Sequence, residues 1–299
     1  MKKILFASTA LVASAGFAAA EISFSGEAGF GVTYLDGRVS VDAGADGVVG
    51  TADDVVTAID DWQPDYYTTL SVAMTGETDG GLSFGADFDI TMDGGATAVG
   101  DTEVYVEGGF GKLTVGAVGS ATDAKLGLSD IGYSGLGMDN VAEALIDAGD
   151  IGNIMYSGSF GDFTVAASYD MAGVENFSLA AIYSMGDYEF GLGYDDWGNA
   201  SNSSVISVKL GADIGDIALD ALYSRNDDLD VTSYGLTAAY TMGAATVTAA
   251  YSEVDVAGAS ADAYGLGVSY DLGGGASVNA GVGEVGGVTV ADLGIIMTF

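Results

Sequence analysis

A short phrase with period-two alternation recurs along this chain, and it limits the possible folds more than any other feature. In GDYEFGLGY at 186–194, every second residue is a bulky Tyr, Phe or Leu, and small or acidic residues stand between them. The same pattern returns at 161–169, 215–223 and 243–251. Such alternation is typical of β-strands with two chemically different faces. A soluble β-sandwich shares this period, so other features must decide which face is dry.

The first 20 residues have the layout of a secretory signal peptide. Lys2 and Lys3 precede an apolar stretch at 4–17, and AAA at 18–20 offers a small-residue cleavage site. An N-terminal membrane anchor is the alternative, but strand-like alternation begins directly afterwards. We therefore expect residues 1–20 to be removed and 21–299 to form one exported domain.

The exported part is strongly acidic and yet apolar overall. All 43 Asp and Glu residues follow residue 20, whereas five Lys or Arg residues do so: Arg38, Lys112, Lys125, Lys209 and Arg225. Hydrophobic residues nevertheless make up 49% of the chain, and the mean hydropathy is +0.35. Carboxylates and apolar side chains at these levels must be segregated in space. Nucleic acid is an implausible partner, because its binding requires neutralisation of phosphates.

The missing residue types exclude several classes of enzyme. The chain contains no Cys and no His, which excludes thiol nucleophiles, His-based triads and the common zinc sites. A hydrolase with paired carboxylates is the remaining enzymatic reading, but no acid pair lies in a motif that supports it. We expect no enzymatic activity.

The alternation predicts sixteen β-strands. Their expected ranges are 22–34, 65–76, 82–90, 102–110, 113–118, 153–160, 163–170, 177–185, 188–195, 203–214, 217–225, 232–242, 245–254, 263–272, 277–282 and 288–299. Short Gly-containing connections alternate with longer polar ones, which we expect at 35–64, 91–101, 119–152, 171–176, 196–202, 226–231, 255–262 and 284–287.

Short turns on one rim and longer loops on the other are the pattern of outer-membrane barrels. Tyr and Phe near the strand ends fit the headgroup levels of a bilayer, although ordinary core aromatics would give a similar pattern. Outside the first 20 residues, there is no run of about 20 apolar residues that would make a membrane helix. The predicted fold is all-β, a 16-stranded antiparallel transmembrane β-barrel in contact with membrane lipid.

Four stretches resemble the general porins of Rhodobacter-type alphaproteobacteria. They are YGLGVSYDLGGGASVNA at 264–280, VADLG at 290–294, TGETDGGLSFGADF at 75–88 and GFGKLTV at 109–115. The resemblance implies a homotrimeric diffusion channel in the outer membrane of a Gram-negative bacterium. The terminal Phe299 also resembles the signal that the outer-membrane assembly machinery reads.

In that family, the loop after the fifth strand folds into the lumen and narrows it. Position assigns this role to 119–152, with a short helix expected at 141–148 and Asn140 as its N-cap. The candidate constriction residues are Asp123, Lys125, Asp130, Asp139, Glu143, Asp147 and Asp150. The alternative is an external, solvated acidic loop.

Strand parity also places charged residues on the inner wall. The candidates are Glu27, Asp87, Asp89, Glu103, Glu107, Glu189, Lys209, Asp213, Asp220 and Asp292. Members of the family oppose the acidic loop with a basic cluster on the wall, and this chain has too few basic residues to build one. We expect a negative potential in the lumen and cation selectivity. The alternative for some of these acids is that they are solvated residues of the wall without an individual role.

The segment DAGADGVVGTADD at 42–54 resembles an oxygen-rich calcium loop. Asp42, Asp46 and Asp53 are its candidate ligands. It lacks the bidentate Glu of such loops, and Gly44 stands where a side-chain ligand is common. A plain Gly/Asp surface loop explains the segment equally well.

The sequence therefore predicts a porin: a passive, water-filled channel for small hydrophilic solutes and cations, without a required cofactor. The alternative is an exported, calcium-binding β-rich surface or adhesin-type protein that is not a channel.

Overall fold

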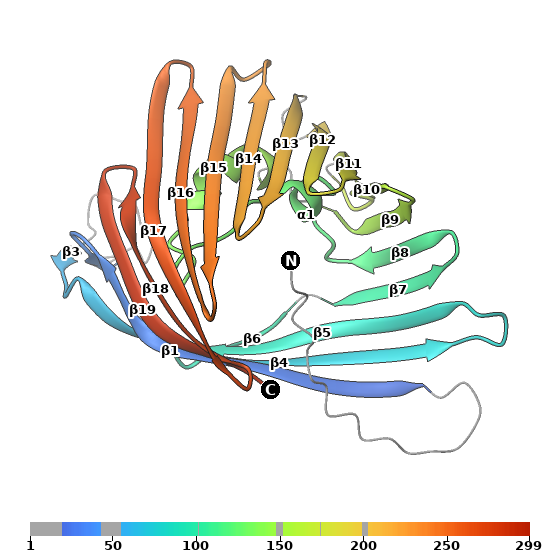
Figure 1. Cartoon of the computed structure of the whole chain (residues 1–299), viewed down its shortest axis with the longest axis horizontal. Helices are drawn as coiled ribbons and strands as arrows, with labels where there is room; N and C mark the ends of the chain where they lie inside the picture. Colours follow the sequence, from blue (N-terminus) through green and yellow to red (C-terminus); the bar gives the residue numbers. More distant parts are fainter. Residues whose placement is uncertain (1–19, 43–54, 101, 148–151, 174, 199–202) are drawn as a thin grey trace.

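A single antiparallel sheet closes on itself and encloses a lumen (Figure 1). The computed structural model describes residues 20–42, 55–100, 102–147, 152–173, 175–198 and 203–299. The first wall strand, β1 (Glu21–Leu35), pairs with β4 (Trp62–Glu77) on one side and with β19 (Val288–Thr298) on the other. Because the first and last strands meet, the wall has no free edge.

Each of the remaining wall strands pairs with its neighbour in sequence. They are β5 (Ser83–Asp93), β6 (Ala96–Val99), β7 (Glu103–Gly108), β8 (Gly111–Gly116), β9 (Ile154–Phe160), β10 (Phe163–Tyr169), β11 (Phe177–Met185), β12 (Tyr188–Asp196), β13 (Ser204–Ile214), β14 (Ile217–Asn226), β15 (Val231–Met242), β16 (Ala245–Val256), β17 (Ala259–Gly273) and β18 (Ala276–Val285).

The strands β6 and β7 are two parts of one wall strand. Both pair with β5, and the register changes between them: Ile90 lies opposite Val99, whereas Asp87 lies opposite Glu103. The β6–β7 strand thus advances one residue more than β5, which is a β-bulge. Counted in this way, the sheet has the sixteen strands that the alternation predicts.

The structure differs from the prediction mainly in the connections. A hairpin of β2 (Val39–Asp42) and β3 (Val55–Ala58) lies within the predicted loop 35–64. β5 and β6 extend into the predicted loop 91–101, and the connections expected at 255–262 and 284–287 are two-residue turns. The physical reason is that strand pairing continues beyond the apolar zone. Alternation fades there, but the backbone groups still satisfy one another.

The two faces of the wall differ in chemistry. Large apolar side chains point outward and are exposed, for example Leu236 (54%), Leu266 (56%) and Leu293 (51%). Their neighbours in sequence point inward and are small or polar, as Thr237, Gly267 and Asp292 illustrate. Of the helices that the structure describes, none has the length and apolar character needed to cross a bilayer.

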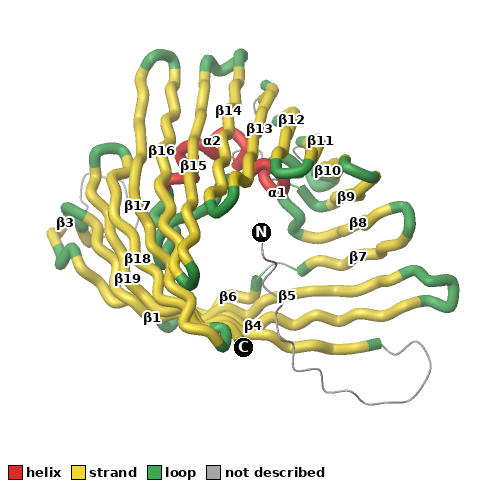
Figure 2. The backbone as a smooth tube through the Cα atoms, viewed as in Figure 1, coloured by secondary structure: helices red, strands yellow, loops and turns green. Residues whose placement is uncertain are grey.

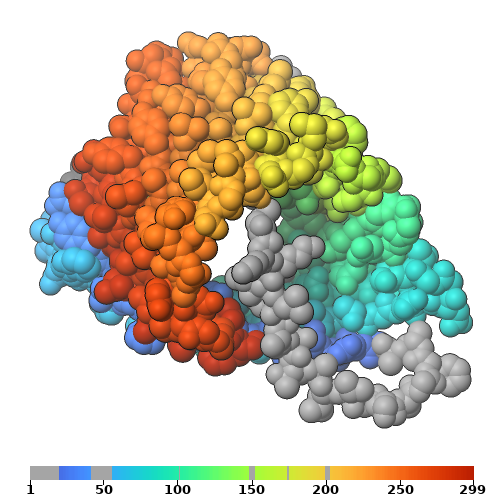
Figure 3. All heavy atoms as spheres, viewed as in Figure 1, coloured from blue at the N-terminus to red at the C-terminus, as the bar shows by residue number. Residues whose placement is uncertain are grey.

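The buried apolar residues lie between the inner wall and a long connection inside the ring. Leu126 and Ile146 of this connection form one cluster with Ile182 and Leu222 of the wall. The two helices of the connection lie inside the ring of strands in Figure 2. The space-filling view shows an opening within the ring (Figure 3).

The outward position of Leu266 on β17 leads to a test of which face contacts lipid. A Leu266→Arg variant should lower the free energy of unfolding in a bilayer by about 2–4 kcal/mol, because a charge would then face hydrocarbon. Ser269→Arg, on the inward face of the same strand, is the matched control and should cost much less. Equal losses for the two variants, measured by denaturant titration in vesicles, would show that the faces are assigned incorrectly.

Candidate functional site

The connection between β8 and β9, residues 117–153, runs along the inner face of the barrel in its described parts, 117–147 and 152–153. It carries α1 (Asp123–Leu126), which contacts β11, β12 and β13, and α2 (Met138–Asp147), which packs on β13 to β17. Figure 1 shows both helices on one side of the ring, with β4, β5 and β7 across the opening. The helix predicted at 141–148 starts at Met138, so Asn140 lies inside the helix and is not its N-cap.

The inner wall is shaped to receive this loop. A Cβ atom on Gly235 would lie 2.5 Å from the Cβ of Ala142, and one on Gly294 would overlap the ring of Tyr133. Glycine at these positions lets the backbone of the loop approach the backbone of the wall. Leu145 of α2 also packs on the wall, where it forms a buried cluster with Trp197 and Val205.

Polar wall side chains hold the start of the loop. The Ala121 N–H donates to Ser168 Oγ at 3.0 Å, and the Thr122 N–H donates to Ser178 Oγ at 2.9 Å. Thr122 Oγ1 also donates to Asp195 Oδ1 at 2.6 Å. Asp195 is 1% exposed. The sequence analysis did not identify Ser168, Ser178 and Asp195 as contacts of the loop. The available signal was their position on the inward face, close to the small glycines of β12 that leave room for a loop.

Two predicted channel residues lie beneath the loop. Lys209 Nζ donates to the Gly127 carbonyl at 2.5 Å, directly after α1, and lies 3.9 Å from Asp220. Asp292 is 4% exposed and accepts hydrogen bonds from the loop backbone at Tyr133 and Ser134. Parity placed both residues on the inner face, but the loop covers them.

Several acidic side chains of the loop lie close together, between the segment that contains α1 and the segment that contains α2. Asp123, Glu143 and Asp147 each place a carboxylate oxygen within 4.8 Å of the others, so they could together hold a divalent cation. Glu143 is buried and accepts a hydrogen bond from the Leu128 N–H. Asp139 is also buried, and Asp130 is its neighbour.

Of the remaining candidates in the loop, Lys125 lies in the last turn of α1, and Asp150 lies outside the described residues.

Burial changes the titration of two of these loop acids. Desolvation, followed by the Asp130 carboxylate and then Glu143, raises the pKa of Asp139 from 3.8 to about 7. Desolvation also raises the pKa of Glu143, against the hydrogen bond from Leu128, which lowers it. The packed arrangement of the loop is therefore more favourable when Asp139 carries a proton.

The wall across the opening is acidic as well. Asp87 and Asp89 on β5 and Glu103 and Glu107 on β7 all lie on the inward parity. Lys112 on β8 lies among them, with its Nζ 4.1 Å from the centre of the Tyr105 ring.

The other predicted wall acids lie on neighbouring strands. Glu27 on β1 accepts a hydrogen bond from Tyr67 Oη at 2.7 Å. Glu189 on β12 and Asp213 on β13 also lie on the inward parity, and Asp213 is exposed.

The predicted calcium loop falls mostly outside the described residues, as do Asp46 and Asp53. The backbone of Asp42 ends β2 and pairs with that of Val55, which brings the two ends of the segment together. Calcium binding there stays a prediction.

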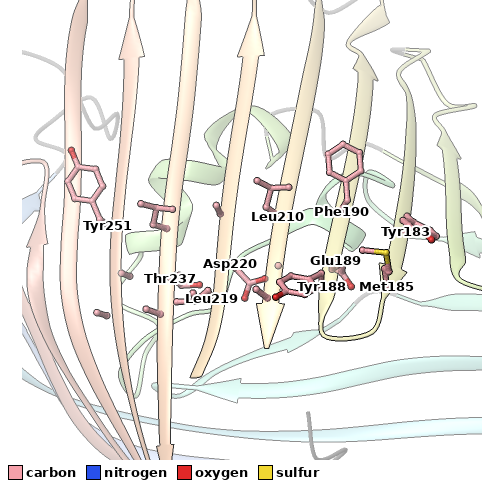
Figure 4. Close-up of a pocket in the computed structure, with 17 residues that line it drawn as sticks. Tyr183, Met185, Tyr188, Glu189, Phe190, Leu210, Leu219, Asp220, Thr237 and Tyr251 are labelled. Atoms are coloured by element: carbon pink, nitrogen blue, oxygen red, sulfur yellow. The ribbon is translucent and has the colours of Figure 1, made fainter. Parts of the chain in front are cut away.

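A large hollow on the surface lies on the outer face of the barrel and not in the lumen. It has a volume of about 760 Å³ and is lined mainly by outward apolar residues of β11 to β16, among them Phe190, Leu210 and Leu219 (Figure 4). The polar residues Glu189, Asp220 and Thr237 also belong to its lining. Tyr183 lies at the right-hand side of the hollow in this view, and Tyr188 lies low, near Asp220. Its mainly apolar lining suits an apolar environment.

The raised pKa of Asp139 predicts a pH-dependent loop. The docked state binds the proton more tightly than an undocked carboxyl does, so docking should weaken as the pH rises from about 4 to about 7 and then level off. Hydrogen–deuterium exchange of loop peptides, corrected for intrinsic rates, should be faster at pH 8 than at pH 5. Asp139→Asn should remove most of this difference, whereas Glu189→Gln should retain it. An unchanged pH dependence in Asp139→Asn would contradict the assignment.

Comparisons with known proteins agree with this architecture. A family model described as Gram-negative porin matches residues 7–288. The porin of Rhodobacter capsulatus is 30% identical over 285 residues, covering 80% of this chain and 95% of that protein. The porin of Fuscovulum blasticum is 28% identical, covering 93% of this chain and all of that protein.

The fold itself has solved counterparts. An engineered variant of the porin of Rhodopseudomonas blastica superimposes with a TM-score of 0.76 at 24% identity, covering 93% of this chain and 100% of that chain. Another variant of the same porin gives a TM-score of 0.72 at 25% identity with the same coverage. The closed sixteen-stranded wall, the family match over most of the chain and these relatives together establish that the chain belongs to the Gram-negative porin family and resides in the outer membrane.

Proposed function

We propose that this porin is a passive channel that favours cations over anions. The observation that carries the proposal is the acidity of both sides of the lumen. Asp87 and Glu107 lie on the wall across from a loop that also carries several carboxylates, and Lys112 is an inward cation near them. Of the other basic residues, Lys209 is bound beneath the loop, Arg225 pairs with Asp227, Arg38 donates to Gln63, and Lys125 lies in the loop.

The mechanism is electrostatic and needs no covalent chemistry. Carboxylates that line a narrow aqueous passage concentrate cations and repel anions, because the surrounding protein does not screen charge as water does. Mobile ions limit the range of this effect to about 10 Å at 0.1 M salt. Selectivity should therefore decrease as the salt concentration rises.

We also propose that the loop 117–153 sets the width of the passage. Its inward position supports this role, because loop atoms occupy part of the lumen between β11 and β17. Small hydrophilic solutes would pass between the loop and the wall of β4, β5 and β7.

The family likeness supports further proposals about assembly. The relatives are channel proteins of the outer membrane, which favours the channel over the exported surface protein that does not span the membrane. A homotrimer, removal of residues 1–20 and recognition of Phe299 by the assembly machinery are proposed on the same basis. Calcium at Asp42, Asp46 and Asp53 is a separate proposal from the sequence.

Charge removal on the wall tests the cation preference. In a planar bilayer under a salt gradient, the wild-type reversal potential should have the sign of a cation-selective pore. The double variant Asp87→Asn/Glu107→Gln should lower the cation-to-anion permeability ratio by roughly threefold or more.

A double variant with the same net charge provides the control. Asp262→Asn/Glu284→Gln removes two outward-facing carboxylates and should leave the ratio almost unchanged. Anion preference in the wild type would refute the proposal, as would equal effects of the two double variants.

A further inference from the structure

The turn of the loop 117–153 is fixed to the wall by one carboxylate. Asp292 Oδ2 accepts three hydrogen bonds: from the Tyr133 N–H at 2.9 Å, from the Ser134 N–H at 2.7 Å and from Ser134 Oγ at 2.8 Å. Two consecutive backbone donors that converge on one oxygen form a favourable site for an anion. Charge-assisted hydrogen bonds of this kind are stronger than neutral ones.

Because Asp292 is buried, it acts as an attachment point for the loop and not as a charge exposed to the lumen. The side chain is 4% exposed, and among the described residues no Lys or Arg forms an ion pair with it. A buried carboxylate without a cationic partner is costly unless hydrogen-bond donors compensate it. The donors of the loop turn supply that compensation at Oδ2, whereas Oδ1 is buried without a hydrogen-bond partner in the described part of the chain, so the carboxylate depends on the turn.

The turn lies across the seam where the barrel closes. Asp292 belongs to β19, and its opposite residue on β1 is Thr33. Tyr133 covers both strands, because Cβ atoms on Gly294 of β19 and on Gly29 of β1 would meet its ring or hydroxyl. The Tyr133 ring also lies 6.4 Å from the ring of Tyr67 on β4. One loop turn thus contacts the last strand and the first two wall strands.

The other attachments of the loop lie far along the wall from this turn. Thr122 is bound to Asp195 on β12, and the Ala142 carbonyl accepts a hydrogen bond from Ser233 Oγ on β15 at 2.7 Å. Between these points and the seam, the loop is held by apolar packing of Ile131 and Met138. Loss of the Asp292 contact would remove the polar attachment of the loop backbone to the wall at this turn.

We propose that Asp292 is a positioning residue that docks the turn of the loop onto the closing seam and so fixes the width of the passage. The width-setting part rests on the proposed role of the loop as the constriction. Because Tyr133 contacts both β19 and β1, the complete docking site exists only when these two strands are paired.

Protease sensitivity of the folded barrel tests the docking without any measurement of current. Asp292→Ala should be cut by proteinase K within 129–137 about tenfold faster than the wild type, with the cuts mapped by mass spectrometry. Asp213→Ala is the matched control, because it removes an inward, exposed carboxylate from β13. It should resemble the wild type. Wild-type resistance in folded Asp292→Ala, or equal sensitivity in Asp213→Ala, would overturn the proposal.

A loop-side variant covers the case in which Asp292→Ala does not fold. Tyr133→Ala/Ser134→Ala removes the hydroxyl donor and the ring from the turn while β19 is unchanged. It should also be cut faster within 129–137, and wild-type resistance would overturn the proposal.

Single-channel recordings test the consequence for the passage. Asp292→Ala should show larger current fluctuations and a higher mean conductance than Asp213→Ala. A released loop with wild-type current would overturn the width-setting part. A wild type that conducts no current would instead refute the proposed function and leave the protease result standing.

Discussion

Each wall strand of this protein must satisfy two solvents at once, and the rest of the structure depends on that constraint. Hydrocarbon outside requires apolar side chains and a backbone without free hydrogen-bonding groups, which only a closed sheet provides. Water inside permits small and charged residues on the alternate positions. The alternation of Tyr264, Leu266 and Val268 with Gly265, Gly267 and Ser269 on β17 expresses both demands in one strand. Closure through β1 and β19 then fixes which residues surround the lumen.

The exceptions to this rule mark the place where the loop lies. Ile182 and Leu222 point inward on their strands, yet both are buried, because Leu126 and Ile146 of the loop cover them. The inward acids divide in the same way. Asp195 and Asp292 bind loop donors and are almost fully buried. Others, such as Asp87 and Glu107, face the open part of the lumen. One set of carboxylates thus shapes the passage, and in our proposal the other set gives it its charge.

The fold could be predicted from the sequence to a large extent, and the site only in part. Strand positions follow from local alternation and turn residues, so they were accessible. The β2–β3 hairpin was not, because its strands, VSVD and VVTA, have only 4 residues each, and a pattern that short does not distinguish a strand from a loop. Parity placed Lys209 and Asp292 on the inner face, but it cannot show that a loop more than 80 residues away in sequence covers them. The burial of Asp139 and Glu143 within the loop likewise depends on tertiary packing. Inward apolar residues such as Leu222 were the available signal that a loop covers the wall, because exposing them to a water-filled lumen would be unfavourable.

Cysteine scanning along β5 tests the separation of the two faces most directly, because the chain has no native Cys. Single cysteines would be placed from Asp87 to Met92 and treated, in vesicles, with a positively charged thiol reagent that cannot cross the membrane. Positions 87, 89 and 91 should react readily, and positions 88, 90 and 92 should be protected by lipid. Uniform reactivity along the strand, or reaction at the even positions alone, would contradict a barrel with a watery interior and a lipid-facing exterior.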